Sequence, residues 1–178
     1  DSIVVRKAAL RDIKQLCDIY LGQPQQVRRW FHPLPFNRTR LKITFLLMLI
    51  SEKTIFITKK TIPKLGFILL AAADTDKSQI VGFWYVRLTR KEAGGLIANV
   101  GIITKVGERG RGVGFKMYSS GIKYSRAVGI TKFRVRTNTD NSATNALVKR
   151  LRYRLIGVTR DEYWEGKYEE MLNWELDL

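Results

Sequence analysis

A glycine-rich segment at residues 108–114, Glu-Arg-Gly-Arg-Gly-Val-Gly, constrains this chain most, because it separates two segments of different periodicity. Residues 97–105 before it are apolar and β-branched, which is typical of a strand, and the residues after it, through Val128, have helical spacing. Glycine permits positive φ and close approach of the backbone to a ligand, and a helix start presents unpaired N–H groups and a positive dipole end. The segment therefore predicts an anion site, with a tight turn that binds nothing as the alternative.

The charge of the chain also favours an anionic partner. Lys and Arg total 32 against 16 acids, a net charge of +16, which favours nucleic acid, an acidic membrane or a phosphorylated ligand. Residues 161–178 contain seven acids and one base, a net charge of −6, so the other 160 residues carry +22. This acidic tail is either a solvated pair of strands or a landing site for a cationic amine.

Length and composition indicate one soluble domain over residues 1–178. The longest apolar run, residues 43–50, is far shorter than the roughly 20 residues that cross a bilayer, and the first residues do not form an export signal. We therefore expect a cytoplasmic protein without a membrane partner. The single cysteine, Cys17, allows no internal disulfide and no cysteine-ligated metal site, so we expect no metal and place Cys17 in the core.

The first half of the chain predicts a strand at residues 3–7, a helix from Arg11 to about Gly22 and a short helical piece at 25–30. A helix at 40–50 has an almost continuously apolar second half, which indicates burial on more than one side. Residues 54–58 have strand composition but are closely flanked by Lys59, Lys60 and Pro63. We interpret 53–64 as a small extra hairpin arm, and the role of 51–64 stays open.

The second half predicts three successive antiparallel strands at 65–73, 79–88 and 96–105, then a helix at 113–128 and a strand at 131–137. A helix begins near Asp140, and two strands at 154–164 and 168–176 close the chain. The fold class is thus α+β (mixed α/β), with a central, mostly antiparallel twisted sheet of about six to seven strands and about four helices on both faces.

These elements and motifs together resemble the GNAT superfamily of acetyl-CoA-dependent N-acetyltransferases over nearly the whole chain. The cofactor motif of that family, Gln/Arg-x-x-Gly-x-Gly/Ala, is met by Arg109, Gly112 and Gly114. The opening strand and helix look like the first elements of the family, and residues 141–153 look like its later helix, with Asn141 and Leu147 at the matching positions.

The resemblance implies that acetyl-CoA lies in a V-shaped opening between the strand before the glycine loop and the strand at 131–137. Backbone groups of Ile102, Ile103 and Thr104 would pair with the pantetheine arm, and Asn141 would contact the cofactor or steady the adjacent loop. The pyrophosphate would be held by the amides of Gly110, Arg111, Gly112, Val113, Gly114 and Phe115. The remote phosphate would meet Lys105, Lys116, Lys149 or Arg150.

The implied chemistry is direct attack of a primary amine on the thioester carbonyl, with a backbone N–H near Ile103 stabilising the oxyanion. Because such an amine is mostly protonated at neutral pH, a base must first remove a proton. Asn99 and Val148 stand where the family often has its glutamate base and tyrosine acid. The remaining catalytic candidates are His32, Tyr153, Tyr163, Glu162 and Glu165, beside a base that acts through water.

Several of these candidates also have plainer interpretations. His32 lies among the aromatic residues and prolines of 30–36, a segment that fits either a pocket wall or a solvated loop. Tyr153 fits a helix end, where the family has an aromatic residue after a glycine, and Arg152 stands at that glycine position.

Two other functions compete with acetyl transfer. A nucleic-acid-binding domain is suggested by the charge and by the basic segments 131–136 and 149–154, and a non-catalytic CoA sensor by the changes at Asn99 and Val148. If the chain is an enzyme, its acceptor is a protein N-terminus, a lysine or a small-molecule amine. Its basic surface would suit a contact with a ribosome or nucleic acid. The sequence leaves the oligomeric state open, with a homodimer as one alternative.

Overall fold

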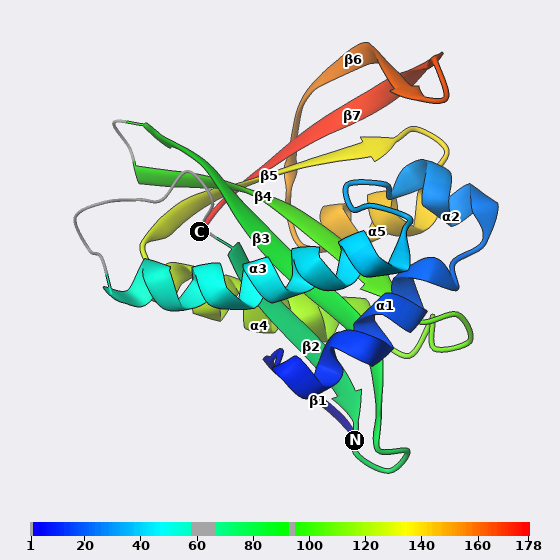
Figure 1. Cartoon of the computed structure of the whole chain (residues 1–178). Helices are drawn as coiled ribbons and strands as arrows, with labels where there is room; N and C mark the ends of the chain where they lie inside the picture. The colour runs from blue at the N-terminus through cyan, green and yellow to red at the C-terminus, as the bar shows by residue number, and fades with distance from the viewer. Residues whose placement is uncertain (1, 58–66, 93–94) are drawn as a thin grey trace.

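The computed structural model describes residues 2–57, 67–92 and 95–178, without the side chains of 52–57, 90–92 and 162–164. In this part of the chain, seven strands form one mixed sheet in the order β1-β2-β3-β4-β5-β7-β6 (Figure 1). The strands are β1 (Ile3–Lys7), β2 (Phe67–Asp74), β3 (Gln79–Glu92), β4 (Gly95–Thr104), β5 (Ile130–Asn138), β6 (Arg154–Trp164) and β7 (Lys167–Asp177). Only the β4–β5 pair is parallel among these strands.

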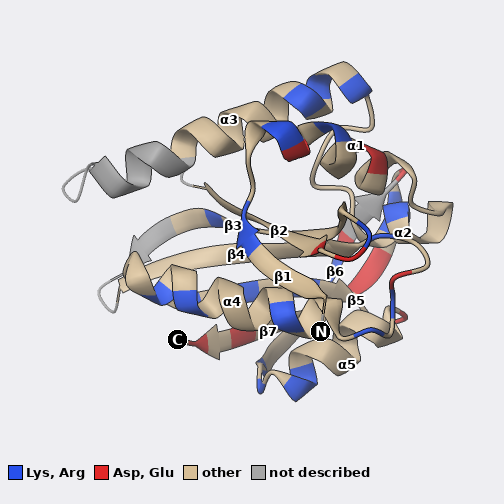
Figure 2. Cartoon of the chain, turned by 90° about the horizontal axis from the view of Figure 1, so that it is seen from below, with Lys and Arg blue, Asp and Glu red and all other residues tan. Residues whose placement is uncertain are grey.

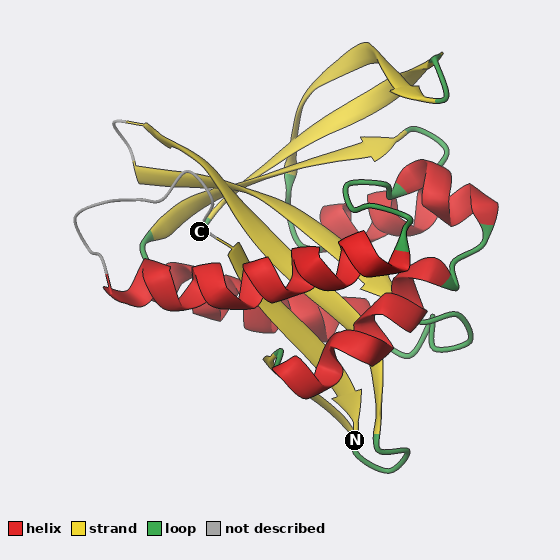
Figure 3. Cartoon of the chain, in the orientation of Figure 1, coloured by secondary structure: helices red, strands yellow, loops and turns green. Residues whose placement is uncertain are grey.

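Helices cover both faces of the sheet (Figure 3). The described helices are the 3₁₀ turn η1 (Leu10–Asp12) and the α-helices α1 (Ile13–Leu21), α2 (Gln25–Trp30), α3 (Arg38–Ile57), α4 (Val113–Ala127) and α5 (Ser142–Arg150). Helices α4 and α5 pack in one core cluster around Trp84 and Phe133. Helices α1 and α3 pack in the other, around Phe83 and the buried Cys17. The predicted mixed sheet with helices on both faces is confirmed, with five α-helices instead of about four.

The sheet opens between β4 and β5. These strands pair from Leu96 opposite Ile130 to Asn99 opposite Arg134. Beyond that point β4 continues along β3, with Thr104 opposite Gly82, while β5 continues along β7, with Asn138 opposite Met171. Each strand thus keeps its outer neighbour while the two inner edges separate, which produces the V-shaped opening that the family resemblance implied.

Helix α3 corrects two expectations. It runs to Ile57, so residues 53–57 are helical and the predicted hairpin arm is wrong there, while 58–64 lie outside the described residues. The β-branched residues near Ile55 have strand propensity, but propensity yields to a helix that is already packed on the sheet. The helix is also not buried on several sides, because Leu47 and Ile50 are more than half exposed.

The backbone after α5 explains why Arg152, at the position where the family has glycine, is followed by a buried Tyr153. Arg152 has φ +64°, the left-handed conformation that favours glycine. Its N–H donates to the Lys149 carbonyl at 2.9 Å, and the Tyr153 N–H donates to the Val148 carbonyl at 3.0 Å. This pair of bonds is a Schellman motif. Arg152 therefore occupies the position expected of the family glycine, and the side chain of Tyr153 turns into the core, where it is 6% exposed.

The acids of the C-terminal tail are bound by bases of the body. Glu175 is buried and accepts hydrogen bonds from Lys132 at 2.9 Å and from Arg134 and Arg154 at 3.0 Å. Asp161 pairs with Arg136, and Glu169 pairs with Arg29 at 2.7 Å. The tail is thus an antiparallel strand pair whose outer strand is exposed at residues 154–160, as the solvated-strand interpretation predicts, and these three acids are engaged by bases and not free for a cationic amine.

The Glu175 cluster predicts a pH-dependent contribution to stability. The hydrogen bond from Lys132, followed by that from Arg134, holds the pKa of Glu175 below its ordinary value of 4.5. Because the folded-state pKa is lowered, the stabilisation is present above about pH 4.5 and is lost as pH falls through the folded value. Glu175→Gln should lower the free energy of unfolding by about 1–3 kcal/mol near neutral pH.

Denaturant titration of both proteins from pH 7 to pH 3 measures this effect, and the two curves should converge at acid pH. Asp177→Asn is the matched control, because Asp177 is 73% exposed and lies 3.5 Å from Lys132. An equal loss in both variants, or a difference that persists at pH 3, would contradict the assignment.

Candidate active site

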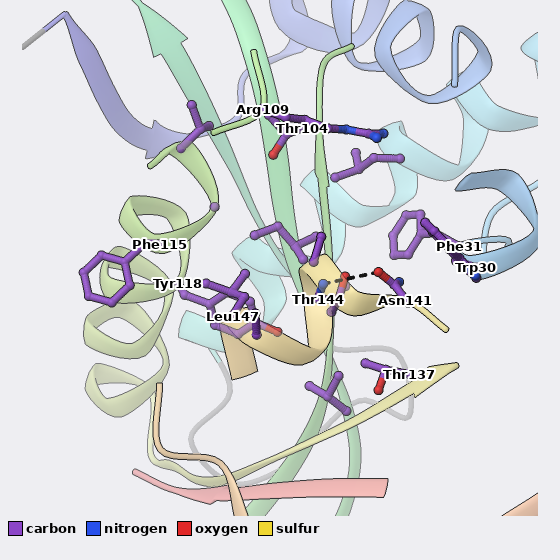
Figure 4. A pocket seen from close by; sticks show the side chains of 18 of the residues that line it. Trp30, Phe31, Thr104, Arg109, Phe115, Tyr118, Thr137, Asn141, Thr144 and Leu147 are labelled. Carbon is purple, nitrogen blue, oxygen red and sulfur yellow. Dashed lines mark hydrogen bonds between the residues drawn. The ribbon is translucent and has the colours of Figure 1, made fainter. Parts of the chain in front are cut away.

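A cavity of about 440 Å³ lies in the opening between β4 and β5, and α2, α4 and α5 complete its walls (Figure 4). Apart from the candidates for the remote phosphate, of which Arg150 alone lines the cavity, the lining includes all but one of the residues predicted to bind the cofactor: Ile102, Ile103, Thr104, Arg109, Gly110, Gly112, Val113, Gly114, Phe115 and Asn141. The structure therefore brings the strand, the glycine loop and the later helix to one site. Arg111 is the exception.

The glycine loop turns the chain from β4 into α4 through left-handed backbone conformations. Gly110 has φ +80° and Gly112, the residue before the first turn of α4, has φ +75°. A Cβ atom at either position would meet no atom within 4 Å. These glycines are thus required by backbone conformation, and both line the cavity at the start of the 15-residue helix α4, whose first amides have no partner within the helix.

Ion pairs anchor this loop to the β2–β3 hairpin. Glu108 is 7% exposed, accepts a hydrogen bond from Lys77 at 2.8 Å and is also bonded to Arg111. Arg111 reaches Asp74 as well, at 3.1 Å. The hydrogen bonds from Lys77 and then Arg111 lower the pKa of Glu108, so it is ionised at neutral pH. The Arg111 side chain is engaged away from the cavity, which leaves its backbone amide for any cofactor contact.

Gln23 is a buried polar residue that the sequence did not single out. Its Nε2 donates to the Ile19 carbonyl at 2.8 Å and to the Thr104 carbonyl at 3.2 Å, while its Oε1 accepts from Arg109 at 2.9 Å. Gln23 therefore joins the end of α1, the end of β4 and the glycine loop. A polar residue between the helix-ending Gly22 and Pro24 carries no sequence signal for this role.

The ladder between β3 and β4 fixes which peptide groups of β4 face the opening. The Lys105 N–H donates to the Val81 carbonyl at 2.8 Å, so Ile103, opposite Phe83 in the same register, also turns its peptide groups toward β3. Successive residues in a strand turn their peptide groups to opposite sides. Ile102 and Thr104 therefore point theirs toward the opening, and Ile103 contributes its side chain to the cavity wall.

Asn141 has a structural role besides its place in the cavity wall. Its side chain accepts a hydrogen bond from the Thr144 N–H at 3.2 Å and so caps α5, as the dashed line in Figure 4 shows. The side chain is 9% exposed. The cap fixes where α5 begins, and this brings Thr144 and Leu147 against the cavity.

Tyr118 is a cavity-lining phenol that the sequence reasoning missed. It lies on α4, has no exposed surface and meets Tyr153 edge to face, with the ring centroids 6.1 Å apart. Burial raises the pKa of Tyr118 above its ordinary value of 10, so the phenol is protonated at neutral pH. Burial likewise raises the pKa of Tyr153, which is not part of the cavity wall. Tyr118 follows the glycine motif at an ordinary helix-core position, so spacing alone marks it as core.

Aromatic side chains at the C-terminal end of α2 form the opposite wall. Figure 4 shows Trp30 and Phe31 across the cavity from Phe115 and Tyr118. The Trp30 Nε1–H donates to Asp140 at 2.9 Å, and Arg29 also contacts Asp140, at 2.9 Å. Together with the Arg29–Glu169 ion pair, these contacts tie α2 across the opening to the β5–α5 turn and to β7. The sequence predicted that aromatic residues near His32 line a pocket, and Trp30 and Phe31 do line this cavity.

The other predicted catalytic residues lie apart from this wall or beyond the described side chains. His32 is half-buried, and its Nδ1 lies 2.9 Å from the Arg29 carbonyl. Glu162 and Tyr163 lie in β6 near its turn, and their side chains are not described. Asn99 is exposed and does not line the cavity.

Among the described residues, no three His, Cys, Asp or Glu side chains form a group that could hold a metal ion. None of the helices in the described ranges is both long and apolar enough to cross a membrane.

Comparison with known proteins identifies the family. The family described as acetyltransferase (GNAT) domain matches residues 2–154. The chain therefore belongs to the GNAT acetyltransferases, enzymes that use acetyl-CoA as co-substrate. Comparison with curated proteins gives no match.

Solved structures share the fold at low sequence identity. The ribosomal-protein-alanine N-acetyltransferase from Brucella melitensis is 17% identical, with a TM-score of 0.77 over 98% of this chain and 99% of that one. A phosphinothricin acetyltransferase from Sinorhizobium meliloti, in complex with acetyl-CoA, is 15% identical, with a TM-score of 0.78 over 100% and 89%. The putative acetyltransferase yncA from Salmonella typhimurium, with its cofactor acetyl-CoA, is 14% identical, with a TM-score of 0.76 over 100% and 95%.

The glycine loop gives a direct prediction about ligand affinity. Gly112→Ala should weaken acetyl-CoA binding by roughly fivefold or more, because a side chain at φ +75° costs about 1–2 kcal/mol and shifts the first amides of α4. Gly129→Ala is a matched control, since Gly129 has φ +82°, equally open surroundings and no place in the cavity wall. Isothermal titration calorimetry measures both, and equal affinities in the two variants would show that the loop does not hold the ligand.

Proposed function

We propose that this enzyme transfers an acetyl group from acetyl-CoA to a primary amine by direct attack on the thioester. One observation carries the proposal: the β4–β5 opening leads directly to the glycine loop and the N-terminus of α4. The pantetheine arm of acetyl-CoA could therefore lie along β4 in the opening, with its pyrophosphate at the adjoining glycine loop. The acetyl-CoA in the Sinorhizobium meliloti and Salmonella typhimurium structures of the same fold supports this assignment.

The residues present fit such a ligand along its length. The outward peptide groups of Ile102 and the outward N–H of Thr104, whose carbonyl already accepts from Gln23, would bond the pantetheine amides, and the amides of 110–115 would hold the pyrophosphate. Arg150 lies over the Phe115 ring, 4.4 Å from its centroid, and both residues line the cavity. Arg150 is therefore our candidate for the remote phosphate. Lys105 has a neighbour of its own, since its Nζ donates to Gln79 at 2.7 Å.

Bound acetyl-CoA would supply the thioester. The proton transfers would then involve residues of the chain and a water molecule. We propose Tyr118 as the donor to the departing sulfur, because this residue lines the cavity and its buried, protonated hydroxyl has no hydrogen-bond partner among the described residues. Among the described residues, Glu108 is the one carboxylate in that wall, and Lys77 and Arg111 already engage it. A water molecule would accordingly take the proton of the amine, while His32, Glu162 and Tyr163 stay predictions.

The acceptor would enter beside Trp30 and Phe31, where the cavity is bounded by α2 and the end of β5. The neighbours named above act on different amines, an alanine of a ribosomal protein and phosphinothricin. The fold therefore does not decide the acceptor, and we propose that the part of the cavity beside Trp30 and Phe31 selects it. A protein N-terminus, a lysine and a small-molecule amine are the classes to compare.

An activity assay tests the proposal. The chain is incubated with acetyl-CoA and, in turn, an alanine-terminated peptide, a lysine peptide with a blocked N-terminus and a set of small amines, and released thiol is measured. Amine-dependent thiol release is the expected result. Acetyl-CoA binding without turnover on any amine would favour the sensor hypothesis, and salt-sensitive RNA binding without acetyl-CoA binding would favour the nucleic-acid hypothesis.

The same assay tests the role of Tyr118. Tyr118→Phe should lower kcat by about 10²-fold with little change in the KM for acetyl-CoA, as expected for a lost proton donor. Tyr153→Phe, which removes the neighbouring phenol outside the cavity wall, should leave kcat within a few-fold. Similar losses in both variants would assign Tyr118 to packing alone.

A further inference from the structure

The outer face of α3 carries an apolar stripe that nothing in the described chain covers. Ile43, Leu46, Leu47 and Ile50 are 52%, 39%, 60% and 54% exposed. Their spacing of three and four residues places them in one row along the helix. The inner row, Leu41, Phe45 and Met48, is at most 2% exposed and packs on the sheet. The helix is therefore apolar on two opposite sides, and only one of them is used by the fold.

Positive charge accompanies the stripe. Helices α1 and α3 lie together on one side of the sheet (Figure 1), and in Figure 2 the N-terminal end of α3 is blue while its middle is tan. The exposed cations described on η1, α1 and α3 are Arg11, Lys14, Arg38, Arg40 and Lys42. Asp18 is the single exposed acid described on these elements, and it pairs with Arg38 at 2.6 Å. We call these residues, with Leu10 and the stripe, the α1–α3 face.

We propose that the α1–α3 face docks on the surface of an anionic lipid bilayer. Aliphatic side chains bordered by Lys and Arg, with almost no acids, are the composition that inserts shallowly among anionic headgroups. Leu10, the first residue of η1, is a further exposed aliphatic residue, 67% exposed beside Arg11.

The charge of the face selects this partner over a second copy of the chain. The described exposed residues of the face carry five cations and one acid, a net charge of +4. Two such faces in contact would repel each other, within molecules that each carry +16. A bilayer with acidic headgroups supplies the opposite charge and the apolar layer together. The proposal departs from the sequence expectation that the protein has no membrane partner.

The face is separate from the acetyl-CoA cavity. None of its residues lines that cavity, which opens between β4 and β5, while α1 and α3 cover β2 and β3. Docking would therefore place the enzyme at a lipid surface without blocking the cavity, and its test is independent of acetyl transfer.

Vesicle co-sedimentation tests the proposal with the intact chain. The protein is mixed with vesicles of phosphatidylcholine alone or with a large fraction of phosphatidylglycerol, at low and high salt. Binding should require phosphatidylglycerol and weaken with salt. Leu47→Gln with Ile50→Gln should reduce the partition coefficient by about tenfold or more, and glutamine keeps good helix propensity. Ile156→Gln with Val158→Gln, at aliphatic residues that are 47% and 56% exposed on the edge strand β6, should bind as the unchanged protein does.

Circular dichroism and acetyl-CoA titration on each variant establish that the fold is kept. Absence of sedimentation with anionic vesicles, or equal losses in the α3 and β6 variants, would overturn the proposal. So would a concentration-dependent dimer in light scattering that the α3 substitutions abolish, because a second copy would then occupy the face.

Discussion

The separation of β4 from β5 is the constraint on which the rest of the site depends. A strand inside a sheet must satisfy peptide groups on both of its edges. Beyond Asn99, β4 has β3 on one edge and an opening on the other, where Ile102 and Thr104 present their peptide groups. The same split leaves β5 held by β7. The opening persists because each strand is fixed by its outer neighbour, and residues of both strands pack in the core cluster that α4 and α5 cover.

Contacts around the opening turn it into a defined site. Gln23 links the end of β4 to the glycine loop, and the Glu108 ion pairs hold that loop to the β2–β3 hairpin. On the far side, Arg29 ties α2 to β7. In the proposed complex the ligand-binding groups would therefore be mostly backbone amides, while the charged side chains fix where those amides lie. This division suits an anionic ligand, because amides need no change of protonation to bind it.

The parts of this protein that could be predicted from the sequence are those in which residue type dictates backbone conformation. Gly110 and Gly112 have positive φ as the loop requires, and the alternating pattern at 131–137 is a strand. The length of α3 could not be predicted, because Ile55 and its neighbours have strand propensity and the packing that overrides it is tertiary. The ion pairs of the tail acids could not be predicted either, since their partners Arg29, Arg136 and Lys132 are distant in sequence. Gln23 and Tyr118 carry no local signal, as each acquires its place only when separate elements meet.

Amide hydrogen exchange with and without acetyl-CoA tests the central claim most directly, that the opening of β4 and the start of α4 form one ligand site. On addition of acetyl-CoA, the amides of Ile102, Thr104 and residues 113–115 should gain protection together. The amide of Ile103, already turned toward β3, should change little. Protection confined to other regions, or equal changes at Ile102 and Ile103, would contradict the account.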